Sequence, residues 1–359
     1  GLEDEAREWF KKLEAGNKEA LKLWKLFKKL SLKDFELIYS LLNVEFDEIS
    51  GESLYNKKAG IVIKELKQKR LLEESQGALI VNLEKYNLGV SIVQKSDGTS
   101  IYVARDLAAA IDRQKRCKFD RMFYEVGSEQ LLHFKQLFKI LELMGYNWAK
   151  NCVHIEHGMY LDKNGKKFAT RKGKTIFMKD IFEETRELVK KEIAKREKLA
   201  EKELEGRAAA IARAAIIYGD LKNQRTNNIL FDIDRFISFE GDTGPYLLYS
   251  YARARSILKK ANRHKKIKFK SLIIEDSERN LISKMSEFPL IVKHAYKNLS
   301  PSIIANYSYQ LAQIFNEFYH SDKVIGSEKE QFRLALVDSF SQVLKNSLFL
   351  LGIQVIEKM

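Results

Sequence analysis

The segment between residues 120 and 157 changes its hydrophobic period twice, and this change constrains the fold more than any other feature of the sequence. Met122–Gly127 and Cys152–Glu156 are short apolar runs of the kind that form buried strands. Between them lies a stretch with apolar residues at helical spacing and a terminal glycine: Leu131, Phe134, Phe138, Leu141, Met144 and Gly145. A strand, a helix and a strand in this order predict a parallel sheet with a crossover helix. Ligands of such sheets bind beyond the carboxyl ends of the strands.

The residues before this segment predict a mixture of helices and short strands. Strands are expected at Ala78–Leu83, Val90–Val93 and Ile101–Val103. Helices are expected at 4–47, at Lys57–Gln68 and from Arg105 to about Arg113.

The residues after Phe177 predict helices almost throughout. Lys179–Leu204 is a highly charged helical stretch, and Gly241–Pro245 is a clear break. Pro245 suits the first turn of a helix that continues to Ala261. Residues 279–352 repeat apolar residues at helical spacing and predict further antiparallel helices.

These patterns predict an α/β fold joined to an all-α fold. We place domain boundaries near residues 100, 176 and 236. They separate a connective insertion (1–100), the second half of a Rossmann-like parallel sheet (101–176), a helical junction (177–235) and an α-helical bundle (236–359).

The composition favours an anionic partner. Lys and Arg number 63 against 49 Asp and Glu, a formal net charge of +14, which suggests nucleic acid or, alternatively, a solvated Lys-rich surface. Cys117 and Cys152 fit no metal-ligand spacing, so we expect no metal site and a reduced, cytoplasmic setting. No apolar run is long enough to span a membrane, and the acidic start is not a secretory signal.

The segment Lys166–Gly173 is the strongest candidate for chemistry. It is rich in cations and follows a predicted strand of an open α/β sheet. A basic loop at that place can stabilise a polyphosphate as charge develops during transfer. By itself it could equally be a solvated turn.

Two pairs of polar residues fall at the same predicted sheet edge. Tyr102 and Asp106 are four residues apart, and a carboxylate beside a phenol suits a guanidinium group. Asp106 could instead stabilise a helix N-terminus. Gln130 and His133 follow the next strand, although a lone histidine is more often structural.

Several motifs in order resemble the arginyl-tRNA synthetases, which are class I aminoacyl-tRNA synthetases. The resemblance covers essentially the whole chain. Lys167–Gly173 is similar to the family's form of the Lys-Met-Ser-Lys-Ser loop, with Phe168-Ala169 in place of Met-Ser and Arg171 in place of the second Lys. The other matching segments are Tyr102–Asp106, His154–Met159, Tyr218–Leu221, Glu240–Tyr246, Tyr251–Arg253, Arg333–Leu336 and Leu350–Met359.

The resemblance implies an arginine–tRNA ligase that uses ATP with Mg²⁺ as a substrate and holds no tightly bound cofactor. Arginine would be held by Tyr102, Asp106 and Gln130. ATP would be bound by His133, His157, Gly158, Met159 and Lys167. The mobile catalytic loop would comprise Lys167, Thr170, Arg171 and Lys172.

The resemblance also implies that the last helical domain reads the anticodon of tRNA-Arg and that the protein is a monomer. The implied tRNA-binding residues are Asp242, Tyr246, Arg253, Tyr319 and Met359, because aromatic rings can stack on unpaired bases. Tyr246 could equally be a packed aromatic at a helix start.

The sequence contains no His-x-Gly-His, the motif that holds ATP in class I synthetases. We therefore expect a C-terminal fragment that is inactive until its N-terminal half is supplied. The alternatives are a free-standing tRNA-binding module without aminoacylation activity and a basic helical protein with degenerate motifs.

Overall fold

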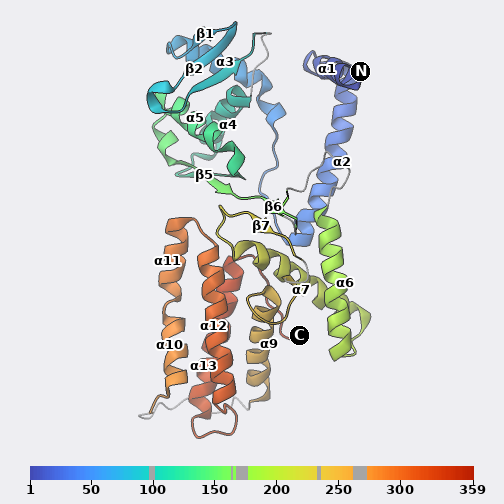
Figure 1. The fold of residues 1–359 in the computed structure, drawn as a ribbon, viewed down its shortest axis with the longest axis vertical. Coiled ribbons are helices and arrows are strands. Elements are labelled where there is room, and N and C mark those ends of the chain that lie inside the picture. The colour runs from blue at the N-terminus through green and yellow to red at the C-terminus, as the bar shows by residue number, and fades with distance from the viewer. Residues whose placement is uncertain (97–101, 163–164, 167–176, 233–235, 262–272) are drawn as a thin grey trace.

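The structure is a computed structural model that describes residues 1–96, 102–162, 165–166, 177–232, 236–261 and 273–359. An α/β body lies at one end of the long axis and a helical bundle at the other, with helix α7 crossing between them (Figure 1). Helices α1 and α2 form an arm that stands apart from the body in this view. In the described ranges, no helix is both long and apolar enough to cross a membrane.

The α/β body contains two small sheets. An antiparallel sheet joins β1 (Glu73–Ser75), β2 (Ala78–Asn82) and β3 (Val90–Gln94). A parallel pair joins β4 (Met122–Gly127) to β5 (Cys152–His157), in register from Met122 opposite Cys152 to Gly127 opposite His157. The helices are α3 (Asn56–Gln68), α4 (Tyr102–Cys117) and α5 (Leu131–Leu143), with the 3-10 helices Glu52–Tyr55, Glu84–Tyr86, Ser128–Gln130 and Asn147–Asn151.

The predicted parallel pairing and its crossover helix are confirmed by β4, α5 and β5. The predicted strands at residues 78–83 and 90–93 are also confirmed, as is the helix at 57–68. One hydrophobic core joins Leu66 and Leu83 to Leu107 and Leu137, so it includes residues on both sides of position 100.

The predicted strand at Ile101–Val103 is wrong. Ile101 lies outside the described residues, and Tyr102 begins helix α4 instead. Val103, Leu107 and Ile111 are all buried, and they recur every four residues. The apolar helical period therefore starts two residues earlier than the Arg105 start that we predicted.

The helical part begins with α6 (Met178–Arg196) and α7 (Glu201–Leu221). The single helix predicted over 179–204 is thus interrupted: α6 ends at Arg196, and Ala200, in extended backbone, caps α7. A parallel pair of short strands, β6 (Tyr160–Leu161) and β7 (Ile229–Leu230), joins this part to the end of β5. The bundle consists of α9 (Gly244–Lys260), α10 (Asp276–Ser286), α11 (Phe288–Asn298), α12 (Ser302–Ser321) and α13 (Glu330–Leu350).

The predicted break at Gly241–Pro245 is confirmed, and it sets how α9 crosses α7. Gly241 has a φ of +77°, which favours glycine. The Thr243 side chain then caps α9 by accepting a hydrogen bond from the Tyr246 amide at 3.3 Å. A Cβ on Gly244 would lie 2.2 Å from the Ala214 carbonyl oxygen, so the two backbones meet at a position that excludes any side chain.

The arm consists of α1 (Leu2–Glu14) and α2 (Lys18–Leu42), which confirms a helical N-terminal region. Its base is attached to the junction helices, where the Arg213 Nε donates to the Leu41 carbonyl at 2.7 Å. Leu41 and Leu42 pack there against Phe182 and Ile216. Farther along α2, large apolar side chains are exposed, including Leu26, Phe27 and Leu30.

Candidate functional site

The carboxyl ends of β4 and β5 lie side by side, because Gly127 is in register with His157. The chain leaves β4 through the 3-10 helix Ser128–Gln130 and enters α5 at Leu131. Gln130 is exposed at this turn. The parallel topology therefore brings the predicted residues on β4, α5 and β5 to one edge of the sheet.

Asp106 and His133 meet at this edge. The His133 Nε2 lies 2.8 Å from the Asp106 Oδ2, which joins the N-terminal parts of α4 and α5. Both side chains remain partly exposed, at 21% for His133 and 39% for Asp106. The neighbouring cation Arg105 forms an ion pair with Glu52 at 3.1 Å, and its guanidinium lies 5.6 Å from the ring centre of Tyr102. Tyr102 itself is 65% exposed. The edge therefore presents an accessible carboxylate and an accessible phenol.

The strand end His157–Met159 is supported by the loop after α7. The Gly158 amide donates to the Arg225 carbonyl at 2.7 Å, and the Arg225 Nη1 donates to the Glu156 carbonyl at 2.5 Å. The Met159 amide donates to Asn228 Oδ1 at 2.9 Å. A Cβ on Gly158 would lie 2.1 Å from the Asn227 carbonyl oxygen, so glycine alone fits here. Arg225 and Asn228 could not be predicted from the sequence pattern, because a polar loop carries no periodic signal.

A cavity of about 1110 Å³ opens beside this strand end. Glu129, His157 and Met159 line it from the α/β body, and Tyr296 and Leu299 line it from the bundle. Three of the predicted ATP-binding residues, His157, Gly158 and Met159, thus share one cavity. Arg121 of the α/β body donates to the Tyr296 hydroxyl of the bundle at 3.3 Å.

Two titratable groups that line this cavity, Tyr160 and Asp220, are partly buried. Burial raises the pKa of the Asp220 carboxyl, and the hydrogen bond with Tyr160 and the interaction with the nearby His157 offset part of that rise. Burial also raises the pKa of the Tyr160 phenol, and the Asp220 charge adds to the effect. The Tyr160 phenol, which carries its proton at neutral pH like any tyrosine, can donate to Asp220.

The basic loop begins from a tight turn after β6. The Lys166 amide donates to Asp162 Oδ1, and the Asp162 amide donates to the Lys166 carbonyl, both at 2.8 Å. The predicted loop residues Lys167, Thr170, Arg171 and Lys172 lie outside the described residues. The described turn places the start of the loop directly after the strand that continues from Gly158.

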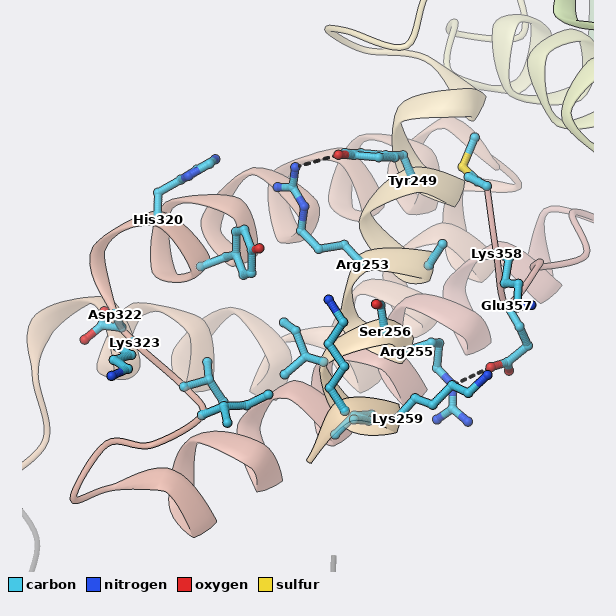
Figure 2. A pocket seen from close by; sticks show the side chains of 18 of the residues that line it. Tyr249, Arg253, Arg255, Ser256, Lys259, His320, Asp322, Lys323, Glu357 and Lys358 are labelled. Carbon is cyan, nitrogen blue, oxygen red and sulfur yellow. Dashed lines mark hydrogen bonds and ion pairs between the residues drawn. The ribbon is translucent and has the colours of Figure 1, made fainter. Parts of the chain in front are cut away.

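A second cavity, of about 1140 Å³, lies in the bundle between α9, the end of α12 and the C-terminal residues (Figure 2). Three of the predicted tRNA-binding residues line it: Arg253, Tyr319 and Met359. Arg253 lies between two rings, with its guanidinium 4.7 Å from the ring centres of both Tyr249 and Tyr319. Its Nη2 donates to the Tyr249 hydroxyl at 3.1 Å, the contact drawn in Figure 2. Further cations line the same cavity: Arg255, Lys259, Lys260, Lys323 and Lys358.

The other two predicted tRNA-binding residues, Asp242 and Tyr246, lie outside the described lining of this cavity. Asp242 accepts from the Tyr218 hydroxyl at 2.6 Å and contacts Lys222 at the crossing of α7 and α9. Tyr246 is partly buried, with its ring edge-on to Tyr309, 5.7 Å away. Its hydroxyl accepts from the Nδ2 of Asn316, which sequence analysis did not single out.

The described residues contain no cluster of three or more His, Cys, Asp or Glu side chains that could hold a metal ion.

Two family models together cover nearly the whole chain. The model described as "tRNA synthetases class I (R), catalytic domain" matches residues 1–233, and that of the DALR anticodon binding domain matches residues 247–359. The α/β body, with its parallel strands and basic loop, thus falls in a class I catalytic domain, and the bundle is an anticodon-binding domain.

Comparisons over the whole of this chain agree with these matches. The chain is 43% identical over 361 residues to the arginine–tRNA ligase of Lactococcus lactis subsp. cremoris and 45% identical over 370 residues to that of Clostridium botulinum, covering 100% of this chain in each case. Its fold matches the crystal structure of arginyl-tRNA synthetase from Plasmodium falciparum with a TM-score of 0.85 and 26% identity, covering 99% of this chain and 62% of that one. The chain belongs to the arginyl-tRNA synthetase family. It spans 64% of the length of these two curated relatives.

Proposed function

We propose that this chain carries the second half of the active site and the anticodon-binding domain of an arginine–tRNA ligase. The observation that carries this proposal is the carboxylate of Asp106, held by His133 at the carboxyl edge of the parallel sheet. A carboxylate in that place can form paired hydrogen bonds with the guanidinium of L-arginine. Tyr102, one turn before Asp106 on α4, and Gln130, at the turn before α5, would complete the described part of the amino-acid site.

ATP, bound with Mg²⁺, is the second substrate in this proposal. In this proposal ATP is bound by His133 at the start of α5 and by His157, Gly158 and Met159 at the end of β5. Lys167 belongs to both the ATP site and the catalytic loop. The arginine carboxylate attacks the α-phosphorus, and the bond to pyrophosphate breaks. Lys167, Thr170, Arg171 and Lys172 stabilise the charge that develops on the leaving pyrophosphate.

In the second step a ribose hydroxyl at the 3′ end of tRNA-Arg attacks the activated carbonyl, and AMP leaves. The bundle binds the anticodon loop through Asp242, Tyr246, Arg253, Tyr319 and Met359. The cations lining the bundle cavity support this assignment, because phosphate contacts supply much of the affinity for RNA. We propose that the protein acts as a monomer in the cytoplasm.

Arginine-dependent ATP–pyrophosphate exchange tests the proposal. The assay uses this chain alone and this chain mixed with the segment of the Lactococcus lactis relative that lies outside the matched region. We expect exchange in the mixture, and we expect Asp106→Asn to lower kcat/KM for arginine about 10- to 100-fold, the value of a charge-assisted hydrogen bond. Asp120→Asn changes an exposed aspartate of the same body and should leave the rate unaltered.

The second candidate function is a tRNA-binding module without aminoacylation activity. The bundle cavity favours it, because its aromatic and basic lining comes almost entirely from α9, α12 and the C-terminal residues. Salt-sensitive tRNA binding with no exchange in either assay would select this alternative. A chain that neither binds tRNA nor supports exchange would refute both functions.

A further inference from the structure

Asn316 lies at the centre of a hydrogen-bond chain that joins two aromatic groups of the bundle. Its Oδ1 accepts from the Arg253 Nη1 at 2.5 Å. Its Nδ2 donates to the Tyr246 hydroxyl at 2.8 Å and to the Ser250 Oγ at 3.0 Å. One amide on α12 therefore contacts three side chains on α9, spaced over two turns of that helix.

The orientation of this amide is determined by chemistry. A guanidinium has donors and no acceptor, so the atom of Asn316 that faces Arg253 must be the carbonyl oxygen. The NH₂ group then faces Tyr246 and Ser250, and both of its hydrogens have an acceptor. The Ser250 hydroxyl in turn donates to the Tyr246 carbonyl at 2.9 Å, which leaves its lone pairs for Asn316.

The contact with Asn316 also fixes the orientation of the Arg253 side chain in the cavity. Its guanidinium is held by Asn316 and Tyr249 through two different nitrogen atoms, so its plane cannot rotate freely. Because the plane lies 4.7 Å from the ring centre of Tyr319, it also restricts that ring. Tyr319 is 38% exposed at the cavity and has surface available for a base.

We propose that Asn316 is a positioning residue that couples the Tyr246 end of the RNA-binding surface to its Arg253–Tyr319 end. The inference rests on the proposed tRNA binding by the bundle. Asn316 itself makes no base contact in this scheme. It sets the relative positions of two aromatic groups before RNA arrives, and such preorganisation lowers the entropic cost of binding.

A double-mutant cycle tests this coupling in the full chain. The probe is a 17-nucleotide RNA stem-loop with the anticodon of tRNA-Arg, and binding is measured by fluorescence anisotropy at one salt concentration. We expect Asn316→Ala to weaken binding about tenfold, as when one stacked base loses its platform. Tyr246→Phe removes the hydroxyl that Asn316 contacts and keeps the ring. It should weaken binding in the native background and have no further effect in the Asn316→Ala background.

A second readout needs no RNA. The guanidinium NMR signals of Arg253 should show hindered rotation in the native chain and averaging in Asn316→Ala. Asn346→Ala is the matched control, since Asn346 is an exposed asparagine on α13 of the same bundle. If Asn316→Ala lowers the unfolding midpoint, Arg253→Lys tests the same coupling by changing the partner of Asn316 instead of Asn316 itself. Lysine keeps the charge, loses the planar fork and should also abolish the effect of Tyr246→Phe.

The outcomes separate this inference from the proposed function. A native chain that does not bind the stem-loop overturns both. A native chain that binds, with additive effects of Asn316→Ala and Tyr246→Phe, overturns the coupling alone. Unchanged Arg253 signals in Asn316→Ala would also overturn it.

Discussion

The helical bundle buries charged side chains, whereas the α1–α2 arm exposes large apolar side chains. The bundle buries Glu278 completely and Arg333 to within 8% of full burial. The arm leaves Phe27 60% exposed and Leu30 53% exposed. Charges inside the bundle are possible because each has several partners, whereas the apolar row on α2 has few contacts with the described chain. The bundle thus depends on internal contacts, and the outer part of the arm contributes little to the stability of this chain.

The largest expected effect comes from breaking the buried charge cluster of the bundle. The Arg333 Nε donates to Glu278 Oε1 and its Nη2 to Asp322 Oδ1, both at 2.7 Å. Arg333→Met leaves the buried Glu278 and the partly buried Asp322 with less compensation, so we expect a loss of about 3–5 kcal/mol in the free energy of unfolding. Urea unfolding followed by circular dichroism measures it.

Tryptophan fluorescence sharpens this test, because Trp9, Trp24 and Trp148 all lie in the arm and the α/β body. Arg333→Met should shift the circular dichroism transition and leave the fluorescence transition in place. Arg279→Met, at an exposed arginine of α10, is the matched control. If both signals shifted together, the bundle and the body would unfold as one unit. The bundle would then not differ in stability from the rest of the chain.

Acid should weaken the bundle through the same cluster. Burial alone would raise the pKa of Glu278, but hydrogen bonds from Glu275, Arg333 and Lys329 hold it below its usual value. The pKa of Asp322 is lowered in a similar way, with Ser277 and Ser321 as donors. A lowered carboxyl pKa contributes stability that is present above the unfolded value, near pH 4, and is lost as the pH falls through the folded value.

The bundle should therefore lose stability progressively below about pH 4. Thermal unfolding followed by circular dichroism between pH 6 and pH 3 measures this loss. Glu278→Gln should have a smaller slope with pH, because its side chain does not titrate. Equal slopes in the two chains would contradict a role for Glu278.

The smallest effect is expected on the arm. Phe27→Ala should change the free energy of unfolding by less than about 0.5 kcal/mol, because its ring is already exposed. The same substitution at Phe340, which is fully buried and stacked on Phe315 with ring centres 3.7 Å apart, should cost about 3–5 kcal/mol. A large loss at Phe27, measured by urea unfolding, would show that the arm is part of a core.

Most elements could be predicted from the sequence because their hydrophobic periods are regular. The period of β4, α5 and β5 indicated a parallel pair, and the Gly241–Pro245 break indicated the start of α9. The strand expected at Ile101–Val103 failed because three apolar residues fit a strand as well as the first turn of a helix. The packing of one face of α4 into the core decided in favour of the helix.

The candidate site could be predicted where residues belong to motifs. The roles of Asp106, Arg253 and Tyr319 came from a family resemblance and remain proposals. Arg225, Asn228 and Asn316 were missed, because each acts through hydrogen bonds to residues far away in the chain.

The sequence by itself indicated strands β2 to β5, most of the long helices, the family resemblance and the cation-rich character of the loop. These properties are local, and they can be read from period, spacing and charge. Only the tertiary structure decided that His133 holds Asp106, that Gly158 meets Asn227, and that Asn316 joins Arg253 to Tyr246. Such contacts depend on how elements distant in the chain pack together, and the spacing of residues along the sequence carries no record of that packing.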